Sequence, residues 1–189
     1  MSNDLRDEEI AVRVQSGDTD AYGILIERYE KKLLRYGTKF LSRTEDMEDV
    51  VQDVFLSVYQ NIQSFDPSQK FSSWIYRIAH NSFVNSLKKT GYLPRTFFDF
   101  DTLFAHTAYD DPSHEERERA ELKQLVERGL AELNPKYREI LTLFYFEELG
   151  YREIADVLAV PIGTVSVRVK RAKEALRAVY DKMNLPYGK

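Results

Sequence analysis

The sequence predicts an all-α protein of two helical domains joined by a flexible linker. Apolar residues recur at three- and four-residue spacing over long stretches, as they do on one face of a helix. No stretch of useful length alternates apolar and polar residues as a half-buried strand would. Glycine and proline are sparse, with 8 and 6 among 189 residues, and they mark boundaries between the periodic stretches. At about 100–200 residues per domain, this length allows one or two domains.

The first 92 residues are expected to form one domain of three or four helices. Periodic stretches at 21–40, 45–60 and 71–89 predict three of them. Their inward-facing residues are Ala21, Leu25, Tyr29, Leu33 and Tyr36, then Met47, Val50, Val51, Val54, Phe55 and Val58, then Phe71, Trp74, Ile75, Ile78 and Ala79. Acidic residues open the second helix and suit the positive end of its dipole. Pro67 separates the second helix from the third, because proline disfavours helical backbone in the residue before it.

A linker is predicted at residues 93–114, because helical periodicity stops there and acidic residues and prolines are frequent. The linker is nevertheless too apolar to be purely solvated. Its apolar residues are Phe97, Phe98, Phe100, Leu103 and Phe104. Two interpretations stay open: an extended segment that lies in a groove of a partner, or a short helix packed on its own domain.

Residues 115–189 are expected to form the second domain, of about four helices. Helical spacing returns at 115–132, and Asn134-Pro135 starts another helix, since asparagine can cap and proline fits the first turn. That helix is expected to run to about Glu147. The residues it should bury are Ile140, Leu141, Phe144 and Tyr145.

Residues 151–176 have the pattern of a helix-turn-helix, with the small Ala155 where two helices cross and a turn from Ala159 to Gly163. If Ala159 is left-handed, it carries a cost of about 1–2 kcal/mol that glycine would avoid. The second helix has several basic residues on its outer side, as expected for a helix that lies in the major groove of DNA. An ordinary helical hairpin with a basic outer face is the alternative.

Charge is segregated along the chain, although the net charge is only −4. Residues 70–96 contain five Lys/Arg and no acid, residues 97–116 contain six acids and no base, and seven bases meet two acids after Gly163. Two basic patches, each in a helical pattern, favour a nucleic-acid partner over a merely solvated face.

Several functions are disfavoured by composition. The chain has no cysteine, which excludes disulfides and thiolate metal sites, and its three histidines show no ligand spacing, so no metal or cofactor is expected. No apolar run approaches the ~20 residues of a membrane-spanning helix, and the acidic, polar N-terminus does not resemble a signal peptide. We expect a cytoplasmic protein without membrane insertion. No phosphate-cradling glycine loop or nucleophile–base pair suggests an enzyme.

Three motifs in order carry a family resemblance: DVVQDVF at 49–55, QSFDPSQKFSSWIYRIAHNSFVNSLKK at 63–89, and the helix-turn-helix about 100 residues later. From about Asp7 to Tyr180 the chain resembles bacterial sigma factors of the extracytoplasmic-function class, group IV of the sigma-70 superfamily. The resemblance implies sigma domain 2 at residues 1–92 and sigma domain 4 at residues 115–189. It implies a factor that binds core RNA polymerase, recognises minus-10 and minus-35 promoter elements and assists promoter melting.

The resemblance also implies roles for individual residues. Those expected to contact core polymerase, on the clamp helices of the beta-prime subunit, are Asp49, Gln52, Asp53 and Phe55. Those expected at the minus-10 element are Asn61, Ser64, Phe65, Lys70, Phe71, Trp74, Arg77, Asn81 and Lys88. Those expected at the minus-35 element are Thr164, Ser166, Val167, Arg168, Lys170, Arg171 and Lys173. For Trp74 and Phe71, burial in the hydrophobic core is the alternative to DNA contact, because both face inward in the predicted helix.

The resemblance further implies control by an anti-sigma factor. Because this chain lacks cysteine, any thiol-based sensing would belong to that partner. Two other functions are alternatives: a helix-turn-helix regulator that binds duplex DNA as a dimer, and a purely protein-binding helical module such as an anti-sigma decoy. The first leaves the motifs between Asp49 and Asn81 without a role, and the second has no need of a basic recognition helix.

Overall fold

The computed structural model describes residues 5–89, 126 and 128–183, and all regular structure within these residues is helical. The first half contains α1 (Asp7–Gln15), α2 (Thr19–Gly37), α3 (Thr44–Asn61), the 3₁₀ turn η1 (Ile62–Ser64) and α4 (Phe71–Lys89). The second half contains α6 (Pro135–Leu141), the π-helical turn η2 (Thr142–Phe146), α7 (Tyr151–Leu158) and α8 (Ile162–Lys182). The predicted all-α fold is confirmed. The predicted linker at 93–114 and most of the helix predicted at 115–132 lie outside the described residues.

The helices of the first half pack around a cluster of buried aromatic rings. Tyr36 of α2 meets Tyr76 and Phe83 of α4 edge to face, with ring centroids 5.3 and 6.0 Å apart. Tyr29 meets Phe71 in the same way at 5.5 Å. All five rings are at most 2% exposed. Such edge-to-face pairs contribute about 0.5–1.5 kcal/mol each beyond the area they bury, so α2 and α4 are firmly fixed to one another.

Gly37, at the end of α2, permits this close packing. A Cβ at that position would lie 2.7 Å from Cζ of Phe83, well inside van der Waals contact. The sequence analysis did not anticipate α1, a short helix whose Ile10, Ala11 and Val14 are nevertheless buried against the same core.

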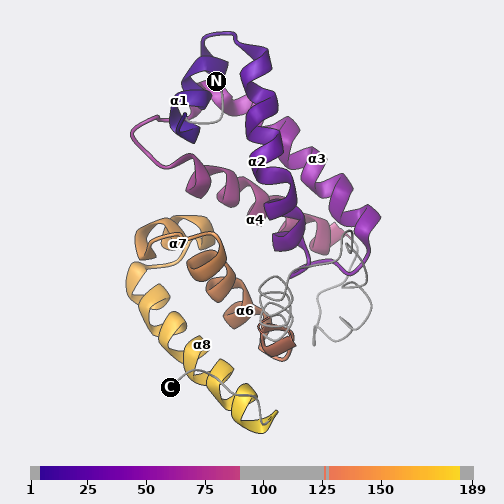
Figure 1. The fold of residues 1–189 in the computed structure, drawn as a ribbon, viewed down its shortest axis with the longest axis vertical. Coiled ribbons are helices and arrows are strands. Elements are labelled where there is room, and N and C mark those ends of the chain that lie inside the picture. Colours follow the sequence, from indigo (N-terminus) through magenta and orange to yellow (C-terminus); the bar gives the residue numbers. More distant parts are fainter. Residues whose placement is uncertain (1–4, 90–125, 127, 184–189) are drawn as a thin grey trace, which may run out of the picture.

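In the second half, α6, α7 and α8 form a compact three-helix unit (Figure 1). The buried guanidinium of Arg138 donates to the backbone oxygens of Leu130 and Leu133, at 2.8 and 3.2 Å, and so ties the chain before α6 to that helix. The helix-turn-helix has its predicted turn, with Ala159 left-handed at φ 50° and ψ 46°.

Tyr145 was expected to be buried, and this expectation is wrong: the residue is 54% exposed. The predicted helix is α-helical only to Leu141 and continues as the wider turn η2. A π-helical turn holds more residues per turn than an α-helix, so the side chains that follow are rotated away from the positions that a regular 3.6-residue period predicts.

The two halves touch where α7 packs against α4 (Figure 1). They also touch through α2, where Arg35 forms an ion pair with Glu147. None of the helices within the described residues is both long enough and apolar enough to cross a membrane.

We predict that Ala159→Gly raises stability. Glycine removes the left-handed strain of about 1–2 kcal/mol, but it loses about 0.5–1 kcal/mol more backbone entropy on folding than alanine does. The free energy of unfolding, measured by urea denaturation, should therefore rise by up to about 1 kcal/mol. The matched control Ala178→Gly, at an exposed position inside α8, should lower it by about 1 kcal/mol. Equal losses in both variants would contradict the prediction.

Candidate nucleic-acid and protein interfaces

The predicted minus-10 residues converge on a small pocket at the start of α4. Its volume is about 130 Å³. It is lined by Ser64, Phe65, Asp66, Gln69, Ser73, Trp74 and Arg77, and by Asp156 from α7. Four predicted residues therefore meet here. A polar rim over an aromatic floor is suited to holding a planar base, which needs a ring to stack on and hydrogen-bond partners at its edge.

Phe65 and Trp74, which line this pocket, belong to an aromatic cluster that also contains Phe71. Phe65 lies 5.4 Å from Phe71 and 5.2 Å from Trp74, and Phe71 lies 5.7 Å from Trp74, between ring centroids. Phe71 is fully buried and Phe65 is 3% exposed, whereas Trp74 is only partly buried. Phe71 thus has the core position that the sequence analysis allowed for it, and Trp74 is the ring of the three with the most open surface.

Side chains from α1 hold the pocket loop in place. Nε2 of Gln15 donates to the backbone oxygens of Ile62 and Phe65, at 2.7 and 2.8 Å. The Gln15 carbonyl in turn accepts from Nε2 of Gln63 at 2.8 Å. Glu8 accepts from the backbone N–H of Phe71 at 3.0 Å and so satisfies a free donor at the start of α4. These bonds join residues 47 to 63 positions apart, which is why sequence periodicity could not reveal them.

Polar and basic side chains continue from the pocket along α4. Arg77, Asn81 and Lys88 are exposed, and their spacing of four and seven residues keeps them on one side of the helix. Lys70 is also exposed, but its ammonium lies 3.0 Å from Glu153 of α7. Asn61 ends α3 and donates its amide N–H to the Ser57 carbonyl at 2.8 Å, and Ser64 donates to the Asn61 carbonyl at 2.7 Å.

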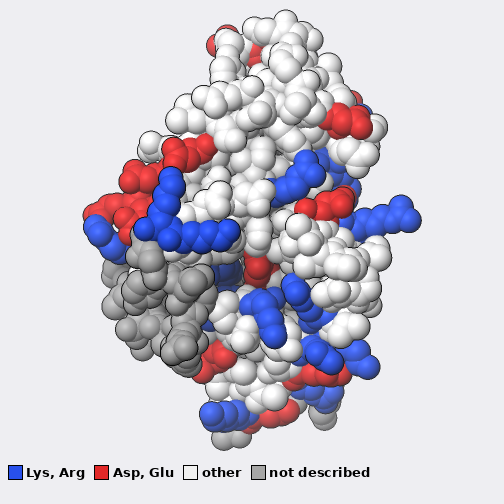
Figure 2. Space-filling view, turned by 180° about the vertical axis from the view of Figure 1, so that it is seen from behind, with Lys and Arg blue, Asp and Glu red and all other residues white. Residues whose placement is uncertain are grey.

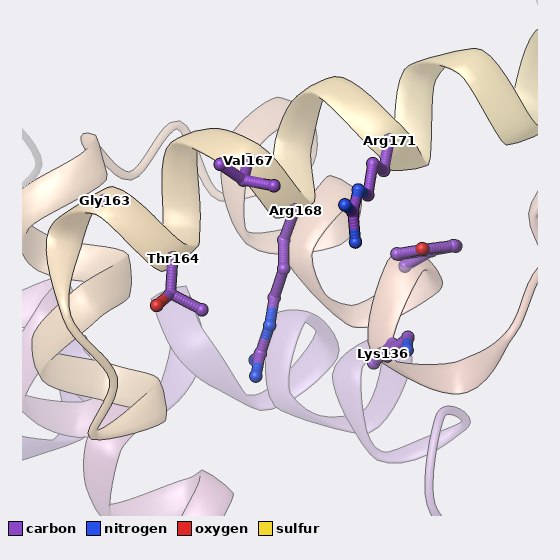
Figure 3. A pocket seen from close by; sticks show the side chains of 7 residues that line it. Lys136, Gly163, Thr164, Val167, Arg168 and Arg171 are labelled. Atoms are coloured by element: carbon purple, nitrogen blue, oxygen red, sulfur yellow. The ribbon is translucent and has the colours of Figure 1, made fainter.

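The predicted minus-35 residues lie on α8 outside its buried stripe, which is formed by Val165, Val169 and Ala172. An open pocket of about 430 Å³ borders the helix. It is lined by Lys136, Tyr137, Gly163, Thr164, Val167, Arg168 and Arg171. The side chains of Arg168 and Arg171 extend from α8 on the side where Lys136 lies (Figure 3). Lys136, which the sequence analysis did not single out, adds a third cation there.

The remaining predicted residues of α8 flank this pocket. Ser166 and Lys170 are exposed, and Val167 is 50% exposed. The ammonium of Lys173 lies 5.3 Å from the ring centroid of Phe144 and 5.2 Å from that of Tyr145. A hydrogen bond with Tyr145 raises the pKa of Lys173, so this charge is held beside the helix. Lysine and arginine are numerous over the lower half of the molecule, where α6, α7 and α8 lie (Figure 2).

Two of the predicted polymerase-binding residues, Gln52 and Phe55, line an apolar groove between α2 and α3, of about 740 Å³. Its walls are Tyr22, Ile26, Leu34, Val51, Phe55, Leu56 and Tyr59, and its polar members are Glu30, Glu48 and Gln52. Asp49 and Asp53 are exposed on α3. Phe55 is only 8% exposed, whereas Leu56 and Tyr59 are 59% and 44% exposed.

Leu56 and Tyr59 were missed by the sequence analysis, although the sequence contains a signal for them. Both are large apolar residues that lie outside the buried stripe of α3. Apolar residues off the buried face of a helix are candidates for contact with a partner when they form a patch.

Comparison with known proteins places the chain in a family. The model for sigma-70 region 2 matches residues 25–91, and the model for sigma-70 region 4 matches residues 123–176. The chain is 32% identical to the ECF RNA polymerase sigma factor SigW of Bacillus subtilis over 173 residues, covering 87% of this chain and 91% of SigW. It is 34% identical to the ECF RNA polymerase sigma-E factor of Escherichia coli over 183 residues, covering 93% and 95% of the two chains.

The chain belongs to the extracytoplasmic-function sigma factors.

Solved structures share the fold of this sigma factor. The structure of CnrH in complex with the cytosolic domain of CnrY matches with a TM-score of 0.65 and 26% identity, over 93% of this chain and 97% of that one. The sigma factor RpoE in complex with the anti-sigma factor NepR from Bartonella quintana matches with a TM-score of 0.64 and 20% identity, over 85% and 96% of the two chains.

We predict that Gln15→Ala loosens the pocket loop of this sigma factor. Two part-buried carbonyls lose their donor, which should cost about 1–3 kcal/mol. Urea unfolding should show the loss, and hydrogen exchange at Ser64 and Phe65 should accelerate while α8 is unchanged. Gln60→Ala, at an exposed position of α3, serves as the control. Unchanged exchange at the loop would rule out this positioning role for Gln15.

Proposed function

We propose that this sigma factor binds core RNA polymerase through α3 and the α2–α3 groove, reads the minus-10 element with η1 and α4, and reads the minus-35 element with α8. The observation that carries the proposal is the presence of two separate polar and basic surfaces, one on each sigma domain, in a chain that also has an exposed apolar groove. Binding to DNA at two sites and to a protein at a third is the requirement for directing polymerase to a promoter.

At the minus-10 element, the proposal assigns the pocket by η1 to an unstacked base. Stacking on an aromatic ring is worth about 1–3 kcal/mol per base, which is comparable to the cost of unstacking one. Trp74 has the open ring surface for this contact, and Ser64 and Asn81 lie exposed where they can bond to base edges. Lys70, Arg77 and Lys88 supply charge for the phosphates. Phe65 lines the pocket, and the buried ring of Phe71 packs against Phe65 and Trp74.

At the minus-35 element, the proposal assigns the outer face of α8 to the major groove. Arg168 and Arg171 can form paired hydrogen bonds with guanine O6 and N7. Val167, half exposed, can make only apolar contact, for example with a thymine methyl group. Thr164, Ser166, Lys170 and Lys173 lie beside them and suit phosphate contacts, which fix the register of a protein on DNA without reading its sequence.

For polymerase, the proposal assigns the clamp helices of the beta-prime subunit to the α2–α3 groove, with further contacts on the beta subunit. Leu56 and Tyr59 supply exposed apolar surface. Gln52 lines the groove, and Asp49 and Asp53 are exposed acids on the same helix that suit a basic partner. The polymerase performs the chemistry, and this chain acts as an adaptor that needs no cofactor. Its place of action is the cytoplasm, where polymerase works.

An anti-sigma factor completes the proposal. RpoE, which shares this fold, has been determined with the anti-sigma factor NepR, so a chain of this architecture can be held by such a partner. A partner that covers the α2–α3 groove would compete directly with polymerase.

Run-off transcription tests the function. The full chain is mixed with core polymerase and with promoters selected from a random DNA pool, and a transcript that depends on this chain is expected. Tight duplex binding that is unaffected by polymerase would favour a helix-turn-helix regulator instead. Binding to neither DNA nor polymerase would favour a protein-binding module such as a decoy.

We predict that Arg171→Ala costs about 1–3 kcal/mol in promoter binding by the holoenzyme and relaxes selectivity at one minus-35 position. The measurement is promoter selection with polymerase present. Lys182→Ala, which removes a cation from the far end of α8, should leave selectivity unchanged. If Arg171→Ala weakens all promoters equally, Arg171 contacts a phosphate and reads no base.

We predict that Asp53→Lys weakens binding to core polymerase by about tenfold, or ~1.4 kcal/mol, because it reverses an exposed charge on α3, the helix proposed to meet polymerase. The chain should remain folded, since Asp53 is exposed. The affinity for polymerase is measured by fluorescence anisotropy, with Asp20→Lys as the control of equal charge change on α2. Equal weakening by both variants would show a general charge effect and would remove Asp53 from the interface.

A further inference from the structure

Helix α8 carries polar side chains on two flanks, one on either side of its outer face. With 3.6 residues per turn, residues four and seven positions apart lie along the same side of a helix. This spacing gives α8 three lengthwise stripes. The buried stripe is Val165, Val169 and Ala172, the first flank is Thr164, Arg168 and Arg171, and the second flank is Ser166, Lys170 and Lys173. Val167 lies between the two flanks, on the face away from the buried stripe.

Helix α6 extends the first flank with a further cation. Lys136 lines the same open pocket of about 430 Å³ as Arg168 and Arg171, and both arginines extend from α8 on the side where it lies (Figure 3). The ammonium of Lys136 lies 5.2 Å from the ring centroid of Tyr137. Its backbone N–H donates to Oδ1 of Asn134 at 3.2 Å, which fixes the start of α6. The pocket therefore brings together three cations from two helices.

The turn η2 extends the second flank with a hydroxyl group. The Lys173 ammonium lies 5.2 Å from the ring centroid of Tyr145, and a hydrogen bond between this ammonium and the Tyr145 hydroxyl raises the pKa of Lys173. A tyrosine oxygen that accepts a hydrogen bond still has its own O–H to donate. Because Tyr145 is 54% exposed, this O–H is open to an anion that approaches Lys173.

The cations on both flanks have no acidic partner in the described part of the chain. None of its ion pairs includes Lys136 or a lysine or arginine of either flank. Phosphates of the DNA backbone are anions that such groups bind. The major groove of DNA is about 12 Å wide, and an α-helix with its side chains has a diameter of about 10–12 Å. A helix that fills the groove therefore turns its two flanks toward the backbones of the two strands.

We propose that Lys136 and Tyr145, which both lie outside the helix-turn-helix, bind backbone phosphates on opposite strands of the minus-35 duplex. Lys136 meets the strand beside the first flank, and Tyr145, together with Lys173, meets the strand beside the second. The proposal rests on the minus-35 role given above to α8, and it adds a contact from each of two further elements. Phosphate contacts on both strands fix the register of α8 in the groove and so hold Val167 over the base edges.

The test uses holoenzyme assembled from core polymerase and the full-length chain. Lys136→Gln removes the charge of an exposed side chain, and Tyr145→Phe removes the hydroxyl but keeps the ring beside Lys173. Lys182→Gln, which removes an exposed charge at the far end of α8, is the matched control for Lys136→Gln. Thermal unfolding checks that the variants are as stable as the native chain.

The affinity for a promoter duplex is measured at several salt concentrations. Each phosphate contact contributes about 0.9 to the slope of log affinity against log salt concentration. Lys136→Gln should therefore reduce the slope by about one and weaken binding about fourfold at about 0.2 M salt, to the same extent for every promoter. Tyr145→Phe removes a neutral donor, so it should keep the slope and weaken binding about three- to tenfold.

Ethylation of single phosphates then identifies the strand that each residue contacts. An ethylated phosphate has no charge, so ethylation weakens binding wherever the protein contacts that phosphate. With the native chain, interfering phosphates are expected on both strands of the minus-35 element. Lys136→Gln should abolish the interference at a phosphate of one strand, and Tyr145→Phe should abolish it at a phosphate of the other.

Four results would overturn the proposal. Equal salt slopes and affinities for Lys136→Gln and Lys182→Gln would show that Lys136 contacts no phosphate, and native affinity in Tyr145→Phe would exclude Tyr145. Interference lost on the same strand in both variants would contradict the opposite-strand arrangement. These three results would leave the minus-35 role of α8 intact. If ethylation of neither strand weakened binding by the native holoenzyme, both this proposal and the minus-35 role would be wrong.

Discussion

The packing of α4 against α2 is the constraint on which the rest of the structure depends. One side of α4 is fixed by the buried rings of Tyr29, Tyr36, Phe71, Tyr76 and Phe83. With that side immobile, the other side presents Trp74, Arg77 and Asn81 in a fixed row next to the η1 pocket. The same immobile helix is the surface on which α7 rests. A site that has to hold an unpaired base gains from such rigidity, because groups already in place need no ordering when the ligand arrives.

The proposed function divides the interactions of the chain between three separate surfaces. The pocket by η1 has a volume of only about 130 Å³, and the net charge of the chain is −4, which opposes strong non-specific attraction to DNA. Affinity must then come from the simultaneous use of both domains on one large partner, since linked sites raise each other's effective concentration. The apolar groove between α2 and α3 is the largest of the three candidate surfaces, as suits the contact with that partner.

Sequence periodicity predicted what depends on local spacing. The helix expected at 71–89 corresponds to α4, and the turn expected to begin at Ala159 lies between α7 and α8. The 3.6-residue period gave a wrong prediction for Tyr145, because the α-helix continues there as the π-helical turn η2 and the side chain is exposed. It also could not find Gln15 and Glu8, whose partners lie in a distant part of the chain. Sequence periodicity could not predict the contact of α7 with α4 for the same reason.

The outward turn of Tyr145 has a consequence for Lys173. Its ammonium rests over two rings before any ligand is present, so the long side chain already samples few rotamers. Immobilising a rotamer-rich side chain at an interface costs about 0.5–1.5 kcal/mol. A phosphate that meets Lys173 would encounter a charge that is already preorganised. The π-helical turn η2, by exposing Tyr145, thereby lowers the entropic cost of an ionic contact made by Lys173 of α8.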